Sequence, residues 1–343
     1  MNYHEIVKGL RDGSISTGLN NTKRKLWPRY CYHFTNIDNA IRILKLGCLL
    51  SRKDAVKQGL MINDNANHEI IKNTKSAIEQ YVRLYFRPQT PTLWDNEGFR
   101  APKYYQNAKC PFPIYFLFSL EKVLSLANVR FSHTSLALHP TPQLYAGEVA
   151  FRQLHFELIY HDSAIEKSDR NKIVHHRQAE IIVPNSLSMD YLQHLVVRTS
   201  AERDTLIQML TSAGISDKYA SKIVIDESNS FFFKNWSYID EVLLSFDKIN
   251  ITAKVDDCAF PNDWSSSKIA LVPENYNDYI DFRLELKDKD GHTWHWPRGG
   301  NSLLRPHFTL TLNRNVSPYK LTIFLNDQIA YQGTYTDDFD LPF

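Results

Sequence analysis

The sequence has few of the features that mark secreted, membrane or metal-binding proteins. Its 343 residues include four cysteines, Cys31, Cys48, Cys110 and Cys258, which lie far apart and form no C-x-x-C pair. This pattern is that of reduced thiols in a cytoplasmic protein, not of a disulfide framework or a zinc site. The longest strongly apolar run, 114–118, is far shorter than the ~20 residues that cross a bilayer, and the N-terminus lacks the apolar segment of a signal peptide. We therefore expect a cytoplasmic protein that does not contact membranes.

Common catalytic and metal-binding motifs are absent as well. The chain contains no G-x-G-x-x-G, no G-x-x-x-x-G-K-[ST], no G-x-S-x-G and no H-E-x-x-H. The pairs His175 and His176, and His292 and His295, have no carboxylate or cysteine at a familiar ligand spacing, and adjacent histidines on a strand point apart. We expect no metal site.

The small net charge conceals an uneven distribution. The chain has 40 Lys and Arg against 38 Asp and Glu, and its 43% hydrophobic content is typical of globular proteins. From Ile239 onward there are 10 Lys and Arg against 16 Asp and Glu, which leaves 30 against 22 in the preceding part. A basic front part and an acidic tail predict two bodies with different partners, and the length also favours two domains.

The hydrophobic pattern changes at the polar tract 227–230, with mixed helices and strands before it and alternating strands after Trp236. We expect an enzyme domain at 1–226 with its core at 28–215, a linker at 227–238 and an acidic β-rich domain at 239–343 that resembles a β-sandwich. The elements expected in the first domain are a helix over 37–44 stopped by Gly47, a polar helix over 66–80, strands at 81–86, 114–118, 179–184 and 195–198, a loop over 88–113, a helix over 120–126, a polar connection over 151–176 and a helix from Thr199 to Leu210. Those expected in the tail are strands at 242–244, 249–251, 280–284 and 308–312 and a hairpin of 320–325 with 329–335.

The first segment with candidate site residues runs from Tyr32 to Arg52. His33 and Thr35 stand at a strand end, a helix follows, and then comes the Ser51-Arg52 pair. A histidine can hydrogen-bond a ribose or an amide, and an arginine can bind a pyrophosphate bidentately, so this order is typical of a dinucleotide cradle. The competing interpretation is a core histidine with a surface arginine.

The second segment is the strand at 81–86. Strand alternation places Tyr81, Arg83 and Tyr85 on one face, which suits an anionic or stacked ligand. The alternative is the solvated face of a half-buried strand.

The third segment carries an acidic residue, Glu180, into the β-branched strand at 179–184. A carboxylate is costly to bury without a partner or a chemical role. The alternative to a chemical role is an ion pair with nearby Arg177.

Together the segments YHFTNIDNAIRILKLGCLLSR, YVRLYFRPQTPTLWDNEGFR and RQAEIIVP resemble the DarT family of NAD-dependent ADP-ribosyltransferase toxins over 28–215. The form Y-V-R-x-Y-F-R-P-x-T-P-T is similar to the guanine-modifying branch, and related toxins that modify messenger RNA are the alternative. The resemblance implies an α+β fold with a split mixed β-sheet, flanking helices and NAD bound in the cleft as co-substrate. It implies no metal.

The resemblance also implies roles for individual residues. Glu180 matches the catalytic carboxylate, and Arg52 and Arg83 are the arginines expected to act with it. Some relatives have an essential arginine between the first two motifs. This chain has none there, so His68 or Arg83 is expected to take that role. The residues expected to contact NAD are His33, Thr35, Asn39, Gly47, Leu49, Ser51, Arg52, Tyr81 and Tyr85. Those expected to contact the nucleic acid are Arg87, Lys167, Arg170, Lys172 and Arg177.

We therefore expect a toxin of a toxin–antitoxin or phage-defence system that transfers ADP-ribose from NAD to a base of single-stranded nucleic acid, with DNA favoured over RNA. The alternatives are an mRNA ADP-ribosyltransferase that blocks translation, an NAD glycohydrolase, and a binding module that only senses nucleotide. A cognate antitoxin and a chaperone are the expected protein partners. The tail is either their docking surface or an appendage that aids folding.

Overall fold

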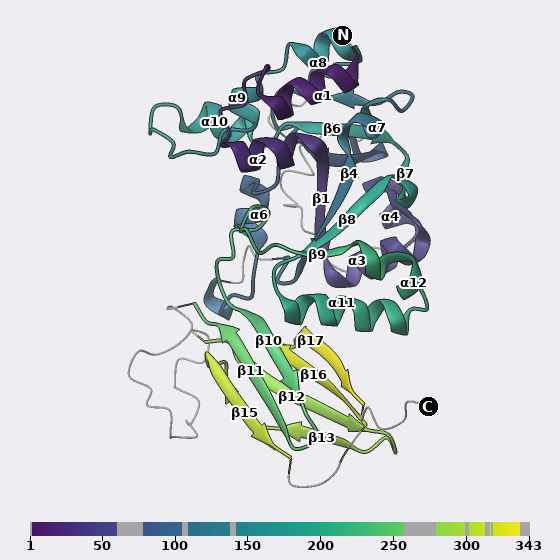
Figure 1. Cartoon of the computed structure of the whole chain (residues 1–343), viewed down its shortest axis with the longest axis vertical. Coiled ribbons are helices and arrows are strands. Elements are labelled where there is room, and N and C mark those ends of the chain that lie inside the picture. The colour runs from purple at the N-terminus through teal and green to yellow at the C-terminus, as the bar shows by residue number, and fades with distance from the viewer. Residues whose placement is uncertain are drawn as a thin grey trace. The chain divides into compact units, whose positions relative to one another are not determined.

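The computed structural model describes residues 2–59, 78–104, 109–137, 142–256, 279–298, 302–312, 316 and 318–336 (Figure 1). The chain divides into two compact units. The first unit consists of 1–95, 114–196 and 228–233, and the second of 96–113, 197–227 and 234–343. Each unit therefore draws on three separate stretches of chain. The division into domains at 1–226, 227–238 and 239–343 stays a prediction.

A mixed β-sheet with flanking helices forms the first unit, which confirms the expected α+β class. Its strands follow the order β5-β6-β3-β1-β4-β8, and β6 pairs antiparallel with β3, as β3 does with β1. The strands are β1 (Tyr30–Asn36), β3 (Tyr81–Tyr85), β4 (Pro113–Ser119), β5 (Arg130–Phe131), β6 (Glu180–Pro184) and β8 (Leu192–Val197), with β2 (Cys48–Leu50) and β7 (Ser186–Ser188) forming a separate pair. The helical elements are α1 (Tyr3–Asp12), α2 (Asn21–Leu26), η1 (Trp27–Arg29), α3 (Ile37–Leu46), α4 (Arg52–Lys57), η2 (Ile78–Gln80), α6 (Pro91–Asn96), α7 (Leu120–Leu124), α8 (Gly147–Arg152), α9 (Phe156–Ile159), α10 (Arg170–His176) and η4 (Met189–Tyr191).

Helix α3 forms as its sequence predicts. Asn36 occupies the N-cap position, and Ile37, Ala40 and Leu44 are buried at helical spacing. The helix ends at Gly47, whose φ of +80° is the left-handed conformation that glycine adopts without steric cost. The expected helix over 37–44 is confirmed, and it fixes the end of β1 against the start of β2.

Two expected connections contain helices. The predicted loop over 88–113 includes α6, which starts at the helix-initiating sequence Thr90-Pro91, where the Thr90 hydroxyl accepts a 3.3 Å hydrogen bond from the Leu93 amide. It also includes the 3₁₀ turn η3 (Pro102–Tyr104). The predicted connection over 151–176 contains α9 and α10. Of the predicted helix over 66–80, residues 66–77 lie outside the described residues, and η2 covers the rest.

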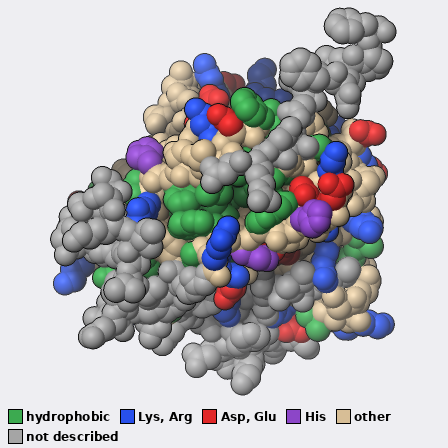
Figure 2. Space-filling view, turned by 90° about the horizontal axis from the view of Figure 1, so that it is seen from below, with side chains coloured by type: hydrophobic (Ala, Val, Ile, Leu, Met, Phe, Trp, Pro, Cys, Tyr) green, Lys and Arg blue, Asp and Glu red, His purple; other side chains and the backbone are tan. Residues whose placement is uncertain are grey.

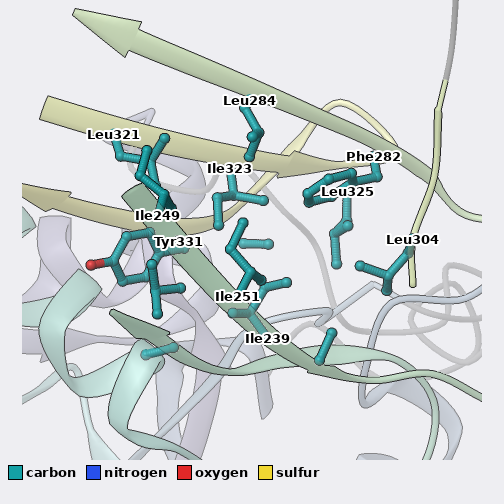
Figure 3. Close-up of a cluster of buried hydrophobic side chains, with 14 of the residues drawn as sticks. Ile239, Ile249, Ile251, Phe282, Leu284, Leu304, Leu321, Ile323, Leu325 and Tyr331 are labelled. Carbon is teal, nitrogen blue, oxygen red and sulfur yellow. The ribbon is translucent and has the colours of Figure 1, made fainter. Parts of the chain in front are cut away.

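The second unit contains the β-rich tail. One sheet has the order β10-β11-β15 and another the order β13-β12-β16-β17, and their apolar faces share one core (Figure 3). Asn326 and Asp327 turn the final hairpin with φ values of +47° and +62°, which match the right-handed twist of the strands they join. The expected strands and hairpin are confirmed. The elements of this unit are α11 (Ser200–Ser212), α12 (Ser216–Tyr219), η5 (Ala220–Lys222), β9 (Ile223–Ile225), β10 (Tyr238–Leu244), β11 (Lys248–Lys254), β12 (Asp281–Asp288), β13 (Thr293–Trp296), β14 (Ser302–Leu303), β15 (His307–Thr311), β16 (Tyr319–Leu325) and β17 (Gln328–Tyr335).

Helix α11 belongs to this second unit. The Thr199 hydroxyl caps it by accepting from the Glu202 amide at 3.2 Å, and it also donates to the Ile239 carbonyl at 2.9 Å. The Glu202 carboxylate accepts from the Arg198 amide at 2.8 Å. Arg198 is fully buried between Glu202 and Glu97 and donates to the Pro111 carbonyl at 2.7 Å, which joins the separate stretches of the unit.

Hydrophobic side chains gather among charged and histidine side chains on the face of the molecule shown in Figure 2. In the second unit, the exposed large hydrophobic residues include Leu243, Phe246 and Trp294. Across the part of the chain that is described, no helix combines the length and apolar character that crossing a bilayer requires. Cys31, Cys48 and Cys110 are free thiols, and Cys258 lies outside the described residues.

Candidate active site

A buried carboxylate and an arginine form a bidentate pair at one end of β6. The Arg83 Nε donates to Glu180 Oε2 at 2.5 Å, and the Arg83 Nη2 donates to Glu180 Oε1 at 2.6 Å. The Glu180 side chain is 1% exposed and that of Arg83 is 38% exposed, so the pair is buried on the carboxylate side and open to solvent on the other. Burial acts to lower the pKa of Arg83, but the neighbouring carboxylate raises it above the usual value. Arg83 therefore carries a fixed positive charge.

The register of the strands explains this pairing. Tyr85 lies opposite Glu180, and Arg83 lies opposite Ile182, so Tyr85, Arg83 and Glu180 share one face of the β3–β6 pair. The expected alternation along 81–86 is confirmed, because Val82 and Leu84 are buried on the other face. Burial, and then the Glu180 charge, raise the pKa of Tyr85. The expected alternative, a Glu180 pair with Arg177, is wrong, because the partner is Arg83.

A segment after β5 encloses Glu180 from a second side. The Leu136 amide donates to Glu180 Oε1 at 3.3 Å, and the Glu180 amide donates to the Ser132 hydroxyl at 3.1 Å. The Ser132 amide donates to the Glu180 carbonyl at 2.9 Å. These contacts fix both the backbone and the carboxylate of Glu180. Sequence patterns gave no signal for Ser132 and Leu136, since no local motif relates them to Glu180.

His33 lies on the neighbouring strand β1, one residue after Tyr32, which stands opposite Tyr85. It is the one residue of β1 that is not fully buried. Its Nδ1 lies 3.3 Å from the Arg83 carbonyl, and its ring meets Phe116 edge-on. Burial lowers the pKa of His33 to about 4, so the imidazole is neutral at pH 7. Phe34, the next residue, stacks on Tyr85 and so connects β1 to the Glu180 face.

Other residues expected to contact NAD lie at the opposite end of β3 and β6. The Ser51 amide donates to the Asn185 carbonyl at 2.7 Å, and Asn185 follows directly after β6. Tyr81 pairs with Pro184 at the same end. Arg52, partly exposed, begins α4 next to Ser51. Four residues of strand, ~13 Å, separate this end from Glu180.

The remaining residues expected to contact NAD form contacts with neighbouring elements of the protein. The buried Asn39 amide donates to the Thr35 hydroxyl at 3.3 Å, which ties the first turn of α3 to β1. The Gly47 carbonyl accepts from the Met189 amide at 2.9 Å, and Leu49 is buried in β2 opposite Leu187.

Arg87 was expected to contact the nucleic acid, but its side chain is buried. Its guanidinium is buried 4.7 Å from the Trp27 ring centroid and donates to the His161 carbonyl and, at 3.4 Å, to Asp162. Burial, and then the charge of Arg177, lower its pKa to about 9. An arginine held in this way stabilises the fold around Trp27 and is not placed to contact a nucleic acid strand.

The other residues expected to contact nucleic acid lie on or beside α10. Lys167, Arg170 and Lys172 are exposed. Arg177 is partly exposed, and its Nη2 lies 2.8 Å from the His161 Nδ1 and 3.1 Å from the Ser163 carbonyl. His68, the suggested substitute for the missing arginine, lies outside the described residues.

Among the described residues, one group has the spacing of metal ligands. Asp288, Asp290 and His292 lie on the turn between β12 and β13. The Asp288 carboxylate already accepts hydrogen bonds from the Asp290 amide at 2.9 Å and the His292 amide at 2.8 Å. These bonds are those of an aspartate-closed turn, and the group lies in the second unit, apart from Glu180.

Comparison with known proteins places the sequence of this chain in a family. Residues 32–232 match the model of the family described as "ssDNA thymidine ADP-ribosyltransferase, DarT". No curated protein matches the chain. Similar solved structures include DarT of Thermus sp. 2.9 with carba-NAD+, at 18% identity and a TM-score of 0.46 over 60% of this chain and 98% of that one. The same protein with ADP-ribosylated ssDNA matches at 17% identity and a TM-score of 0.46, over 60% of this chain and 97% of that one. DarTG of Thermosipho africanus with ADP-ribose matches at 15% identity and a TM-score of 0.47, over 63% of this chain and 53% of that one.

Proposed function

The chain belongs to the DarT family and is an NAD-dependent ADP-ribosyltransferase, and from this premise we propose that it modifies a base of single-stranded DNA, with Glu180 as its catalytic carboxylate. The observation that carries the proposal is the Arg83–Glu180 pair. A carboxylate that is 1% exposed, held by two bonds from an arginine and one from the Leu136 amide, has a fixed position beside a cation.

Glu180 supplies negative charge where the reaction needs it. NAD provides the ADP-ribosyl group when its nicotinamide–ribose bond breaks, the bonding electrons leave with nicotinamide, and positive charge develops on the ribose as in glycoside cleavage. A fixed carboxylate stabilises that charge and accepts the proton that the attacking base nitrogen loses as its bond to the ribose forms. Glu180 is the residue that we assign to both roles.

Arg83 acts through Glu180. Its bidentate bonds fix the orientation of the carboxylate. Arg83 thereby takes the role of the essential arginine that this chain lacks between its first two motifs. The partial exposure of Arg83 leaves its outer side available to a substrate.

NAD binding is assigned to both ends of the β3–β6 pair. His33, Tyr85 and Arg83 lie at the Glu180 end, and Ser51, Arg52 and Tyr81 lie ~13 Å away along the strands. A separation of this size suits a dinucleotide whose reactive ribose lies at Glu180 and whose pyrophosphate binds Arg52. Thr35, Asn39, Gly47 and Leu49 support this cradle from β1, α3 and β2.

Incubation with NAD labelled in its adenylate part tests the acceptor. We expect label on single-stranded DNA and none on duplex DNA. Label on RNA alone would identify an mRNA-modifying enzyme, and nicotinamide release without label on either polymer would identify a glycohydrolase. Oligonucleotides with thymidine or guanine as the single variable base decide which base is modified.

The matched variant is Glu180→Gln, which preserves the size of the side chain, keeps one acceptor oxygen and removes the charge. We expect it to remain folded and to lose transfer of label by at least ~100-fold, since general acid–base catalysis alone contributes about 10²–10⁴-fold. Wild-type transfer by a folded Glu180→Gln variant would contradict the assignment.

We propose further that the protein acts as a toxin of a toxin–antitoxin or phage-defence system. Modification of single-stranded DNA would block copying of the strand, so expression of the wild type should stop growth, whereas the Glu180→Gln variant should not.

The second unit has an exposed sheet edge that could bind a protein partner. Strand β13 lies at one end of its sheet and carries Trp294, which is 41% exposed. Such an edge can pair with a strand of an antitoxin or chaperone. Co-purification of the full chain with proteins encoded beside it tests this partner assignment.

A further inference from the structure

Four neighbouring rings, each at least partly exposed, lie in the first unit, and the catalytic assignment above does not use them. The His133 ring centroid lies 4.4 Å from that of Tyr145 and 5.7 Å from that of His155. The His155 and His176 ring centroids are 5.8 Å apart. We call these four residues the ring platform. His155 is exposed, and the other three are partly exposed.

The ring platform is connected directly to the segment that holds Glu180. His133 lies between Ser132 and Leu136, the two residues that hydrogen-bond Glu180. The Ser135 amide donates to the His175 carbonyl at 3.0 Å, which joins this segment to the end of α10 next to His176. The Tyr145 backbone exchanges two hydrogen bonds with Phe131, at 3.0 Å and 2.9 Å. The rings are therefore attached to the same short stretch of chain that encloses the carboxylate.

Two cations lie on the helix that carries His176. Lys172 and Arg170 are exposed on α10, and the His176 Nδ1 donates to the Lys172 carbonyl at 2.8 Å. Burial is the main cause that lowers the pKa of His133 and His176, and their histidine neighbours lower it further. Neutral imidazoles at pH 7 have flat faces without a charge to hydrate. Among the described residues, the nitrogens of these histidines do not form a group with metal-ligand spacing.

Partly exposed rings beside lysine and arginine are the combination with which proteins bind unpaired nucleotides, because bases stack on rings while phosphates bind the cations. We propose that the ring platform stacks the bases that flank the modified base of a single-stranded DNA acceptor, with Lys172 and Arg170 on the phosphates. This inference rests on the proposed function, since it names the acceptor subsite of the same reaction.

The test is binding of a fluorescent single-stranded oligonucleotide, measured by anisotropy at fixed salt, to the full chain and three variants. His155→Ala removes an exposed ring, and the His133→Ala/His155→Ala double variant removes two. Each stacked base that is lost weakens binding about 5- to 150-fold, so we expect about a 5-fold rise in Kd for the single change and a larger rise for the double change. His155→Phe keeps a flat ring and should restore most of the affinity.

The matched control is His4→Ala, which removes an exposed histidine that pairs with Glu121 outside the ring platform. We expect its Kd to equal that of the wild type. Wild-type affinity in the double variant, or an equal loss of affinity for duplex DNA, would overturn the ring platform. A wild type that neither binds nor modifies single-stranded DNA would instead overturn the proposed function, so the two failures are distinguishable. Circular dichroism and the thermal midpoint of each variant verify its fold.

Discussion

Replacement of Arg83 by methionine is the change whose consequences the structure defines most closely. Methionine preserves much of the apolar stem and removes both hydrogen bonds to the Glu180 carboxylate, at 2.5 Å and 2.6 Å. The carboxylate then keeps the 3.3 Å hydrogen bond from the Leu136 amide. Because Glu180 is 1% exposed, water molecules cannot replace the two lost hydrogen bonds unless the surrounding chain moves.

The expected cost follows from the burial of each partner. Removal of one member of a fully buried ion pair destabilises a protein by about 3–5 kcal/mol. The Arg83 side chain is 38% exposed, so solvent screens the pair and we expect a loss of about 1–3 kcal/mol. Arg83→Lys restores the charge but not the bidentate geometry, and its loss should lie between that of Arg83→Met and the wild type.

Urea denaturation of the wild type, Arg83→Met, Glu180→Gln and the double variant measures this coupling in a double-mutant cycle. We expect the two changes to be non-additive by about 1–2 kcal/mol. Nicotinamide release should fall at least ~10-fold in Arg83→Met, which corresponds to ~1.4 kcal/mol of the barrier. Additive stability changes together with wild-type nicotinamide release in Arg83→Met would refute the role of Arg83.

Two further predictions concern pH and the second unit. The pKa of His33 is about 4 in the folded chain against about 6.5 in an unfolded one, so stability should fall as the pH drops from about 6.5 to about 4, and urea denaturation of His33→Gln should show a smaller fall. An identical pH dependence in both proteins would contradict the burial of a neutral His33. Arg198→Met removes the ion-pair partner of the buried Glu202 carboxylate, and chemical denaturation should show a loss of about 3–5 kcal/mol. A loss below ~1 kcal/mol would show that this carboxylate does not depend on Arg198.

Local patterns predicted the elements whose causes are local. The apolar spacing of α3 and its stop at Gly47, the alternation of β3 and the Asn326-Asp327 hairpin all depend on residues within one or two turns of each other. The helix α6 was missed although its Thr90-Pro91 start is a recognised signal, because the density of prolines nearby favoured a loop.

Contacts between residues that lie far apart in the sequence were harder to predict. The sequence singled out both Glu180 and Arg83, but the ion-pair alternative considered for Glu180 was Arg177, three residues away, whereas Arg83 is 97 residues away. Arg87 continues the alternation of Tyr81, Arg83 and Tyr85, yet β3 ends at Tyr85 and the chain then turns, which buries Arg87 against Trp27. Periodicity cannot show where a strand stops when a proline-rich segment follows.

The central claim is that this chain transfers ADP-ribose to a base of single-stranded DNA with Glu180 as the catalytic carboxylate. Mass spectrometry of a defined oligonucleotide after incubation with NAD and the full chain tests it most directly. The account predicts an oligonucleotide heavier by one ADP-ribosyl group on a base with the wild type, and an unchanged oligonucleotide with folded Glu180→Gln. An unmodified oligonucleotide with the active wild type, or a modified one with Glu180→Gln, would contradict it.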